Sequence, residues 1–288
     1  PLTAPFINNC HYLYTLQLAA KMAAVLGKTD DVALYEKKAA ALRHALHERF
    51  YEPATRSYAG GAQPYLAFPL LVNIVPPDLR PAVMQNLEET TLVKNSGHID
   101  AGMHGTYFLL KYLMEQDRND LIFQMVSKRD YPSWGYMLDQ GATTIWEDWS
   151  GSMSHIHDTL ISVGSWFIQG IGGIRIDEKS PSFRHFVIKP GVVGDLTFAR
   201  AMYRSPYGTI ASNWRLKSGV LHLDVTVPPG TTATMHVPTT KPPAVTEGRR
   251  PATQSPGVRA VGVEKGKAVF EVESGDYAFE APLVAAPG

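Results

Sequence analysis

The sequence predicts an α + β protein in two parts, a helical region followed by an antiparallel β-sandwich. In the first part, apolar residues recur every three or four positions, as on one face of an amphipathic helix. Beyond Gly172 this period gives way to alternation of apolar and polar residues, clearest in LHLDVTV at residues 221–227. Successive helical hairpins joined by aromatic-rich loops favour a barrel or toroid of helices. We place the boundary near residues 171–180 and expect domains at residues 1–173 and 174–288.

The first two helices are predicted from two apolar stripes separated by a short turn. The stripes comprise Leu13, Leu16, Ala20 and Ala24, then Val32, Tyr35, Ala39, Leu42, Leu46 and Phe50. Gly27 lies between them and is a residue that commonly ends a helix. Thr29, Asp30 and Asp31 predict a capped, negatively charged start for the second helix. Because the turn is so short, the two helices are expected to be antiparallel.

The remaining elements follow from the same two patterns. Further helices are expected at residues 62–72, 79–91, 101–115, 119–126 and 154–170. Turn-forming residues at 207–208, 218–219, 228–230 and 274–275 then separate short strands. Strands at this spacing, with no helices between them, are typical of an antiparallel sandwich.

The composition excludes several classes of protein. The 27 basic and 27 acidic side chains balance, so the chain has no positive footprint for nucleic acid. No run of eighteen apolar residues exists to span a membrane. The single cysteine, Cys10, rules out an internal disulfide framework. The chain begins PLTAPFINNC, without Met or a signal peptide, so we expect either a removed leader or a piece of something longer.

One aromatic and acidic segment carries the strongest chemical signal. YPSWGYMLDQGATTIWEDWSG, at residues 131–151, holds three tryptophans, two tyrosines and three carboxylates. Indoles beside Glu147 exclude water, which favours its protonated form or strengthens its hydrogen bonds. Aromatic faces beside carboxylates suit sugars, and glycoside hydrolysis needs two carboxyl groups across the cleaved bond. The structural alternative is that Glu147 pairs with an arginine or caps a helix at Ser154.

Two histidine-containing segments give weaker signals. His155 and His157 would point about 200° apart on a helix, so we expect no shared metal ion. In GHIDAGMHGT, at residues 97–106, Gly102 and Gly105 would permit close helix approach. The alternative there is that Asp100 or His98 lies at a pocket. Phosphate-loop and nucleophile-elbow motifs do not occur in the sequence.

The most specific string is YPSWGYMLDQGATTIWEDW followed by HDTLISVGSWFIQGIGGI. Together with LGKTDDVALYEKKAAALRHALHERFY, GHIDAGMHGT, YRSPYGTIASNW and LDVTVPPGTTATMHVP, it resembles the α-L-rhamnosidases of glycoside hydrolase family 78 over nearly the whole chain. The resemblance implies an (α/α)6 barrel followed by an antiparallel β-sandwich. It also implies inverting hydrolysis of terminal α-L-rhamnose from glycosides or polysaccharides, without a metal or an organic cofactor. A periplasmic or extracellular location would suit such substrates.

The resemblance also implies roles for four residues. Glu147 falls on the family's general base, which deprotonates the attacking water. His157 falls on a histidine that lines the sugar subsite, with residues 162–164 in register, although Ile161 stands where the family usually has Gly. Trp146 and Trp149 are expected to wall the pocket, or else to pack the loop.

The family's general acid has no counterpart in this chain. It belongs to a motif resembling D-x-P-x-R-E-R, and residues 1–97 contain nothing similar. Six or seven helices are expected here against the twelve of a full barrel, so we predict an incomplete barrel with about half of the helices. Its partner would be the N-terminal half of the same enzyme, without which an apolar helical face stays exposed. Asp100, Asp139, Asp148 and Asp158 are the alternative acids.

We expect the isolated chain to be weak or inactive, because general acid–base help is typically worth about 10²–10⁴-fold. One alternative is a non-catalytic carbohydrate-binding or structural fragment. Another is a polysaccharide lyase on the same helical toroid, with Tyr136 and His157 as its bases. In a lyase, the Trp-Glu-Asp-Trp string would have no role.

Overall fold

The structure is a computed structural model that describes residues 3–283. The chain forms two compact units. The first comprises the residues up to Gln116 together with Gln124–Ser162, and the second comprises Asp117–Phe123 with the residues from Val163 onward. The first unit is helical and the second is mostly β, so the predicted fold class is confirmed.

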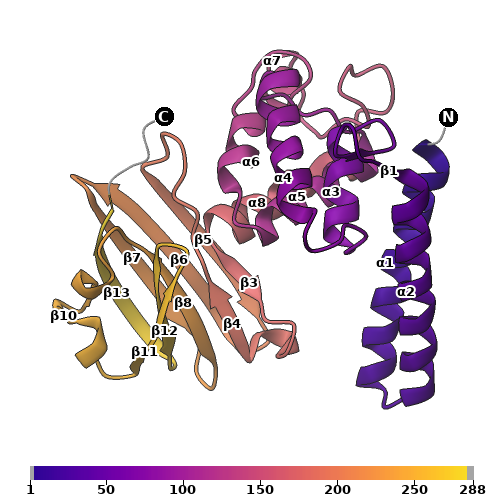
Figure 1. Cartoon of the computed structure of the whole chain (residues 1–288). Helices are drawn as coiled ribbons and strands as arrows, with labels where there is room; N and C mark the ends of the chain where they lie inside the picture. The colour runs from indigo at the N-terminus through magenta and orange to yellow at the C-terminus, as the bar shows by residue number, and fades with distance from the viewer. Residues whose placement is uncertain (1–2, 284–288) are drawn as a thin grey trace. The chain divides into compact units, whose positions relative to one another are not determined.

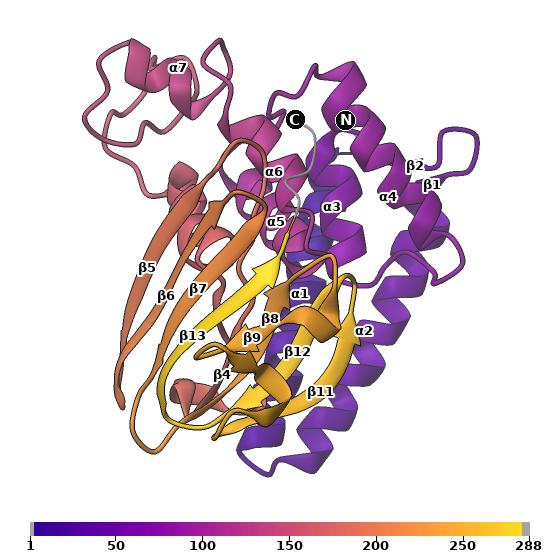
Figure 2. The same ribbon diagram turned by 90° about the vertical axis from the view of Figure 1, so that its left-hand side faces the viewer.

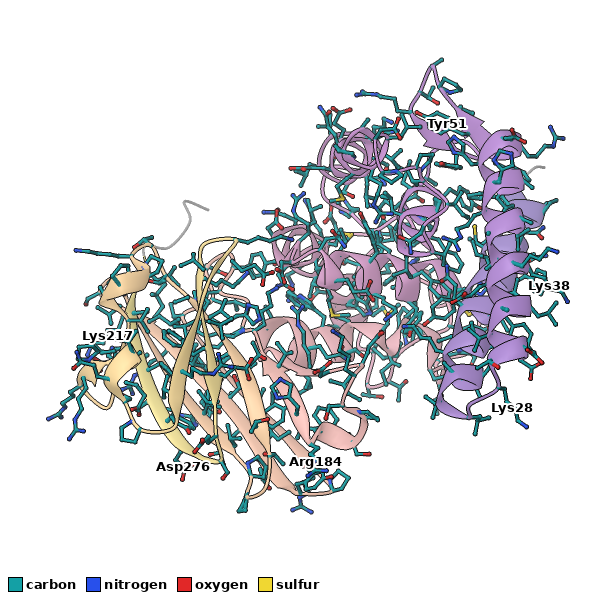
Figure 3. All side chains as sticks on the ribbon, turned by 60° about the horizontal axis from the view of Figure 1, so that its bottom comes forward. Lys28, Lys38, Tyr51, Arg184, Lys217 and Asp276 are labelled. Atoms are coloured by element: carbon teal, nitrogen blue, oxygen red, sulfur yellow. The ribbon has the colours of Figure 1, made fainter. Side chains whose placement is uncertain are left out.

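The first unit begins with the expected antiparallel hairpin of α1 (Thr3–Val25) and α2 (Thr29–Phe50) (Figure 1). Figure 3 shows Lys28 at one end of this hairpin and Tyr51 at the other. The predicted stripes are buried at Leu13, Leu16, Ala20, Ala39, Leu46 and Phe50. The predicted cap is wrong, because Lys28 is the N-cap and no side chain bonds to the helix start. Asp30 and Asp31 do lie in the first turn.

Shorter helices complete the helical part. They are α3 (Gln63–Leu71), α4 (Arg80–Glu89), α5 (Met103–Glu115), α6 (Asn119–Val126), α7 (Trp134–Asp139) and α8 (Ser162–Trp166). A two-strand ribbon of β1 (Tyr51–Glu52) and β2 (Ser57–Tyr58) follows α2. Four of the predicted ranges coincide with α3 to α6. The short α7 was not predicted; the Ser133 hydroxyl caps it by accepting from the Tyr136 N–H at 2.9 Å.

The predicted helix at residues 154–170 is wrong in its first half. Residues 154–158 are irregular, a 3₁₀ turn spans Thr159–Ile161, and α8 begins only at Ser162. Ile156, a member of the predicted stripe, is 78% exposed. A helix that began here would use the Ser154 carbonyl in its first turn, but that carbonyl accepts from the Glu147 N–H at 2.8 Å instead. His155 and His157 therefore lie on a loop, and the helical argument about their directions does not apply.

The second unit is a sandwich of two sheets with strand orders β10-β9-β13-β7-β6-β5 and β11-β12-β8-β4-β3 (Figure 2). The strands of the first sheet are β5 (Phe198–Ser205), β6 (Gly208–Lys217), β7 (Val220–Val227), β9 (Thr246–Glu247), β10 (Arg250–Pro251) and β13 (Gly275–Pro282). Those of the second are β3 (Ile174–Ile176), β4 (His185–Ile188), β8 (Thr232–Pro238), β11 (Val258–Glu264) and β12 (Lys267–Val272). The predicted alternation in β7 is confirmed, with Leu221, Leu223, Val225 and Val227 buried. One pairing departs from the antiparallel expectation, because β4 runs parallel to β8.

A partly buried ion cluster lies in the second unit around Asp117. The Asp117 carboxylate is within 2.7 Å of the Lys189 ammonium, 3.4 Å of the Arg175 guanidinium and 3.6 Å of the Lys267 ammonium. Burial opposes its ionisation, but the hydrogen bond from Lys189 and the three positive charges prevail and lower the pKa of Asp117. Nearby, burial and then the charge of Lys189 lower the pKa of His236 to about 4. This cluster is structural in character.

Two features are absent from the described residues. None of their helices is long and apolar enough to cross a membrane. Nor do these residues contain a group of three or more His, Cys, Asp or Glu side chains placed to hold a metal ion.

Candidate active site

Glu147 and His157 lie on two antiparallel segments that are joined at their base by backbone hydrogen bonds. The His157 N–H donates to the Ile145 carbonyl at 3.0 Å, and the Glu147 N–H donates to the Ser154 carbonyl at 2.8 Å. The Ser154 N–H in turn donates to Oε2 of Glu147 at 3.3 Å. The carboxylate is thus held by the segment opposite it. Both side chains are half-buried.

Neither form of the structural alternative for Glu147 is present in the described residues. No helix begins at Ser154, so Glu147 is not a helix cap. Across residues 3–283, no arginine or lysine forms an ion pair with Glu147. Within the described residues its carboxylate therefore has one backbone donor and no cationic partner.

The tip between these segments is organised by Asp148. The backbone N–H groups of Ser150 and Met153 each donate to the Asp148 carboxylate at 3.1 Å. The hydroxyls of Ser150 and Ser152 donate to it as well. These bonds, that from the Ser150 hydroxyl above all, lower the pKa of Asp148. A carboxyl with a lowered pKa stays ionised, which argues against Asp148 as a substitute general acid.

Trp146 packs inside this loop. Its indole is 6% exposed and stacks on the His155 ring, with centroids 4.8 Å apart. A Cβ at Gly151 would come within 2.6 Å of the Trp146 ring, and Gly151 has a φ of +74°. The His155 ring also contacts the Gly151 carbonyl at 2.9 Å. Trp146 therefore supports the loop from within.

Trp149 lines a pocket of about 420 Å³ in the helical unit. Its Nε1 donates to the Ala101 carbonyl at 2.8 Å, and its ring meets that of Trp134 edge to face at 5.0 Å. The pocket wall also includes Ala62, Pro64, Tyr65, Ile99, Asp100, Gly102, Tyr131 and Pro132. An indole, two phenols and a carboxylate around one hollow are suited to a sugar ring. Glu147, His157 and Trp146 are not among the residues of this wall.

The glycine-rich segment shapes the same pocket. A Cβ at Gly105 would come within 2.7 Å of Pro64, so the expected close approach is present there. Gly102 has open space instead. His98 does not line the pocket; its ring contacts Asp130 at 2.8 Å and the Asn95 carbonyl at 3.0 Å. Of His98 and Asp100, only Asp100 lines the pocket.

Gln63 holds the glycine-rich segment in place through hydrogen bonds. This role was not predicted from the sequence. Its side chain is fully buried. Oε1 accepts from the Asp100 N–H at 2.7 Å, while Nε2 donates to the His98 carbonyl and the Thr91 hydroxyl, both at 3.1 Å. The amide nitrogen and the carbonyl oxygen are thus both bonded to residues distant in sequence, and nothing in the local pattern around Gln63 indicates that role.

Two family models match the chain. The bacterial alpha-L-rhamnosidase 6 hairpin glycosidase domain matches residues 3–171, and the bacterial alpha-L-rhamnosidase C-terminal domain matches residues 173–251. The chain belongs to the bacterial α-L-rhamnosidase six-hairpin glycosidase family. The predicted family is thereby confirmed.

Individual relatives agree with this assignment. An alpha-L-rhamnosidase of Streptomyces avermitilis is 33% identical over 95% of this chain and 26% of its own length. One of Formosa agariphila is 28% identical over 96% of this chain and 31% of its own. The crystal structure of the Streptomyces avermitilis enzyme complexed with L-rhamnose has a TM-score of 0.86 at 31% identity, covering 96% of this chain and 26% of that one. The Dictyoglumus thermophilum enzyme gives 0.85 at 28% identity, covering 94% and 31%. The chain spans about a quarter to a third of the relatives it matches.

Proposed function

We propose that this chain supplies the general base and part of the sugar site of an inverting α-L-rhamnosidase. The proposal rests above all on Glu147, which lies in the string that most resembles the family. Its carboxylate is half-buried and has no cationic partner among residues 3–283. The substrate would be a glycoside or polysaccharide with a terminal rhamnose. Residues 1–173 would belong to the barrel domain, and residues 174–288 would form the closing sandwich domain.

The mechanism gives each group one task. Oε2 of Glu147 is held by the Ser154 N–H, which leaves the other oxygen to take a proton from water. The activated water attacks the anomeric carbon on the face opposite the leaving oxygen. His157 lies on the partner segment and donates to or accepts from a sugar hydroxyl. Trp149 offers its ring face to the sugar in the pocket.

The general acid would come from the N-terminal half of the same enzyme. In an inverting enzyme the two carboxyl groups stand about 6.5–9.5 Å apart, so that water fits between base and sugar. Among the alternative acids, Asp139 is paired with Arg129 and Asp158 is 91% exposed. We therefore assign the acid to the N-terminal half rather than to either of these two residues.

Exposed apolar side chains on the first helix support such a partner. Along α1 and the turn after it, Tyr12 is 49%, Leu18 41%, Met22 66%, Val25 88% and Leu26 69% exposed. Helices of the N-terminal half would cover these side chains and complete the barrel. The free energy gained by burying them would be about 25 cal/mol for each Å² removed from water.

The test is nitrophenol release from an aryl α-L-rhamnoside, with the chain alone and with the N-terminal half restored. We expect turnover only in the restored enzyme, and a fall of about 10²–10⁴-fold for Glu147→Gln. Asp139→Asn, a carboxylate of the same segment, is the matched control and should retain activity. The anomer first released, followed by NMR, reports inversion.

Three results would contradict the proposal. Equal activity of Glu147→Gln and the parent restored enzyme would remove Glu147 as the base. Rhamnose binding without turnover in the restored enzyme would favour a non-catalytic carbohydrate-binding fragment. An unsaturated sugar that absorbs in the ultraviolet would favour a lyase.

A further inference from the structure

A groove of about 440 Å³ lies over strands β5, β6 and β7 of the six-stranded sheet. Its outward-pointing side chains are Phe198, Arg200, Asn213, Arg215, Lys217 and Asp224. All six lie at alternate positions of their strands and so on the same face of the sheet. The intervening Ala201 and Trp214 are buried in the sandwich. The groove is therefore built on the solvent face of the sheet, within the second unit alone. Figure 3 shows Lys217 at the outer margin of the sandwich.

The strand register places five of these side chains in two neighbouring rows, and Lys217 in a third row opposite Val220. Arg200 stands opposite Asn213, and Asn213 stands opposite Asp224. In the next row, Phe198 stands opposite Arg215. Directly opposed side chains in an antiparallel sheet have Cβ atoms about 4.5–5.5 Å apart, so each row presents one continuous surface.

The charge of the groove is positive. Arg200, Arg215 and Lys217 stand against the single carboxylate of Asp224. The whole chain has balanced charges, so this surplus is local and does not follow from composition. A cationic groove of this size selects an anionic ligand.

These charged groups are also available to a ligand. In the described chain, no hydrogen bond or ion pair engages the side chains of Arg200, Arg215 or Asp224. Other arginines of the protein are engaged; Arg118, for example, pairs with Asp120 at 2.8 Å. A free guanidinium fork matches a carboxylate in a bidentate arrangement.

The remaining residues favour a sugar as the carrier of that anion. Phe198 is 64% exposed beside Arg215, so its ring can cover the C–H face of a pyranose. Asn213 and Asp224 supply the amide and carboxylate that bond to hydroxyl groups. An aromatic ring, hydroxyl partners and carboxylate partners on one rigid sheet form a recognition surface for an acidic sugar.

We propose that this groove binds an acidic glycan, with carboxylates of its uronate units on Arg200 and Arg215 and a sugar ring on Phe198. The site is separate from Glu147 and does not depend on hydrolysis. It would hold a carboxylate-bearing polysaccharide to the sandwich unit.

The experiment is calorimetric titration of the full chain with an oligogalacturonate and with its fully methyl-esterified form. The ester keeps the rings and hydroxyls but removes the charges. We expect the acid to bind, the ester to bind at least about tenfold more weakly, and salt to weaken binding of the acid. Arg200→Ala and Arg215→Ala should each weaken binding about tenfold, the loss expected for one charge-assisted hydrogen bond.

Arg204→Ala is the matched control, because Arg204 is exposed on the same face of β5 but lies outside the groove. It should bind the acid as the parent chain does, and circular dichroism should show that all variants remain folded. Equal binding of acid and ester would overturn the proposal. So would equal loss in Arg204→Ala, or tighter binding of dextran sulfate than of the oligogalacturonate, which would indicate general attraction of polyanions. The ligand contains no rhamnose, so Glu147→Gln should bind it normally whether or not the rhamnosidase proposal holds.

Discussion

Glu147 and Asp117 are both partly buried carboxylates, but their bonding partners differ. Asp117 has three cationic side chains within 3.6 Å. Glu147 has one backbone N–H and no cationic partner in the described chain. A carboxylate surrounded by cations is a poor proton acceptor, because protonation would leave those cations unopposed. The difference in partners supports the general-base role that we propose for Glu147.

The partners of the two carboxylates lie at different distances along the sequence. The partners of Asp117 come from β3, from the residue after β4 and from β12, so the cluster ties distant strands together. The contacts of the Glu147 loop come mostly from residues within about one dozen positions of it in sequence. Substitutions in the cluster should therefore change global stability, whereas substitutions in the loop should act locally.

The largest effect on stability is expected from Asp117→Asn. It leaves Lys189, Arg175 and Lys267 without their shared anion, so the free energy of unfolding should fall by about 2–3 kcal/mol. Urea unfolding followed by tryptophan fluorescence measures this loss. Asp120→Asn, which breaks the exposed pair with Arg118, is the control and should cost less than about 0.5 kcal/mol. Equal losses in the two variants would show that the Asp117 cluster stabilises the chain no more than an exposed ion pair does.

A second effect is the pH dependence that His236 confers. Its pKa is about 4 in the folded chain against an ordinary value near 6.5, so the unfolded chain binds the proton more readily. Its contribution is complete above about pH 6.5 and is lost as the pH falls towards 4. His236→Gln should reduce the change in unfolding free energy between pH 7 and pH 4 by about 2 kcal/mol.

Urea unfolding at several pH values measures this slope, and His236→Asn provides an independent replacement. The charged groups facing His236 are Lys189, Glu264, Lys267 and Asp117. Asp117 has a lowered pKa, so its own contribution is present above pH 3.8 and is lost below that value. An unchanged slope in both His236 variants would contradict the assignment.

The smallest effect is expected in the Glu147 loop. Gly151→Ala adds a Cβ that meets the Trp146 ring and imposes a positive φ on alanine, at a local cost of about 1–2 kcal/mol. Gly141→Ala is a matched control, because Gly141 also has a positive φ but open space around its Cβ position. Near-ultraviolet circular dichroism should change more in Gly151→Ala, and its rhamnosidase turnover in the restored enzyme should fall further. Identical behaviour of the two variants would show that packing on Trp146 is unimportant.

The elements predicted well from sequence are those whose pattern is local. The α1–α2 hairpin and β7 carry apolar periods that match their buried faces, so tertiary contacts only reinforce local preference. The range 154–170 fails for the opposite reason. Its stripe has the helical period, but the Ser154 carbonyl, which a helix beginning there would use, accepts from Glu147 outside the range. The parallel pairing of β4 with β8 likewise depends on chain segments some fifty residues apart.

The candidate site divides in the same way. Glu147 was proposed because its neighbours in sequence are themselves unusual, and Trp149 because an aromatic ring beside an acid suits a sugar; the catalytic and binding roles of both stay predictions. Gln63 could not be identified, because its three partners lie 28 to 37 residues away. Trp146 shows a further limit, since this tryptophan, three positions before Trp149, packs inwards on His155.

The backbone bonds that close the Glu147 loop have one more consequence. Backbone hydrogen bonds join Ile145 to His157 and Glu147 to Ser154 on either side of the tip. Within the tip, the Asp148 carboxylate accepts hydrogen bonds from the residues that follow it. The tip is therefore a self-contained appendage on a fixed stem. Residues could be inserted or deleted between positions 149 and 152 without resetting the register of Glu147 against His157, so the tip is the place where the length of this loop can change at least cost to the stem.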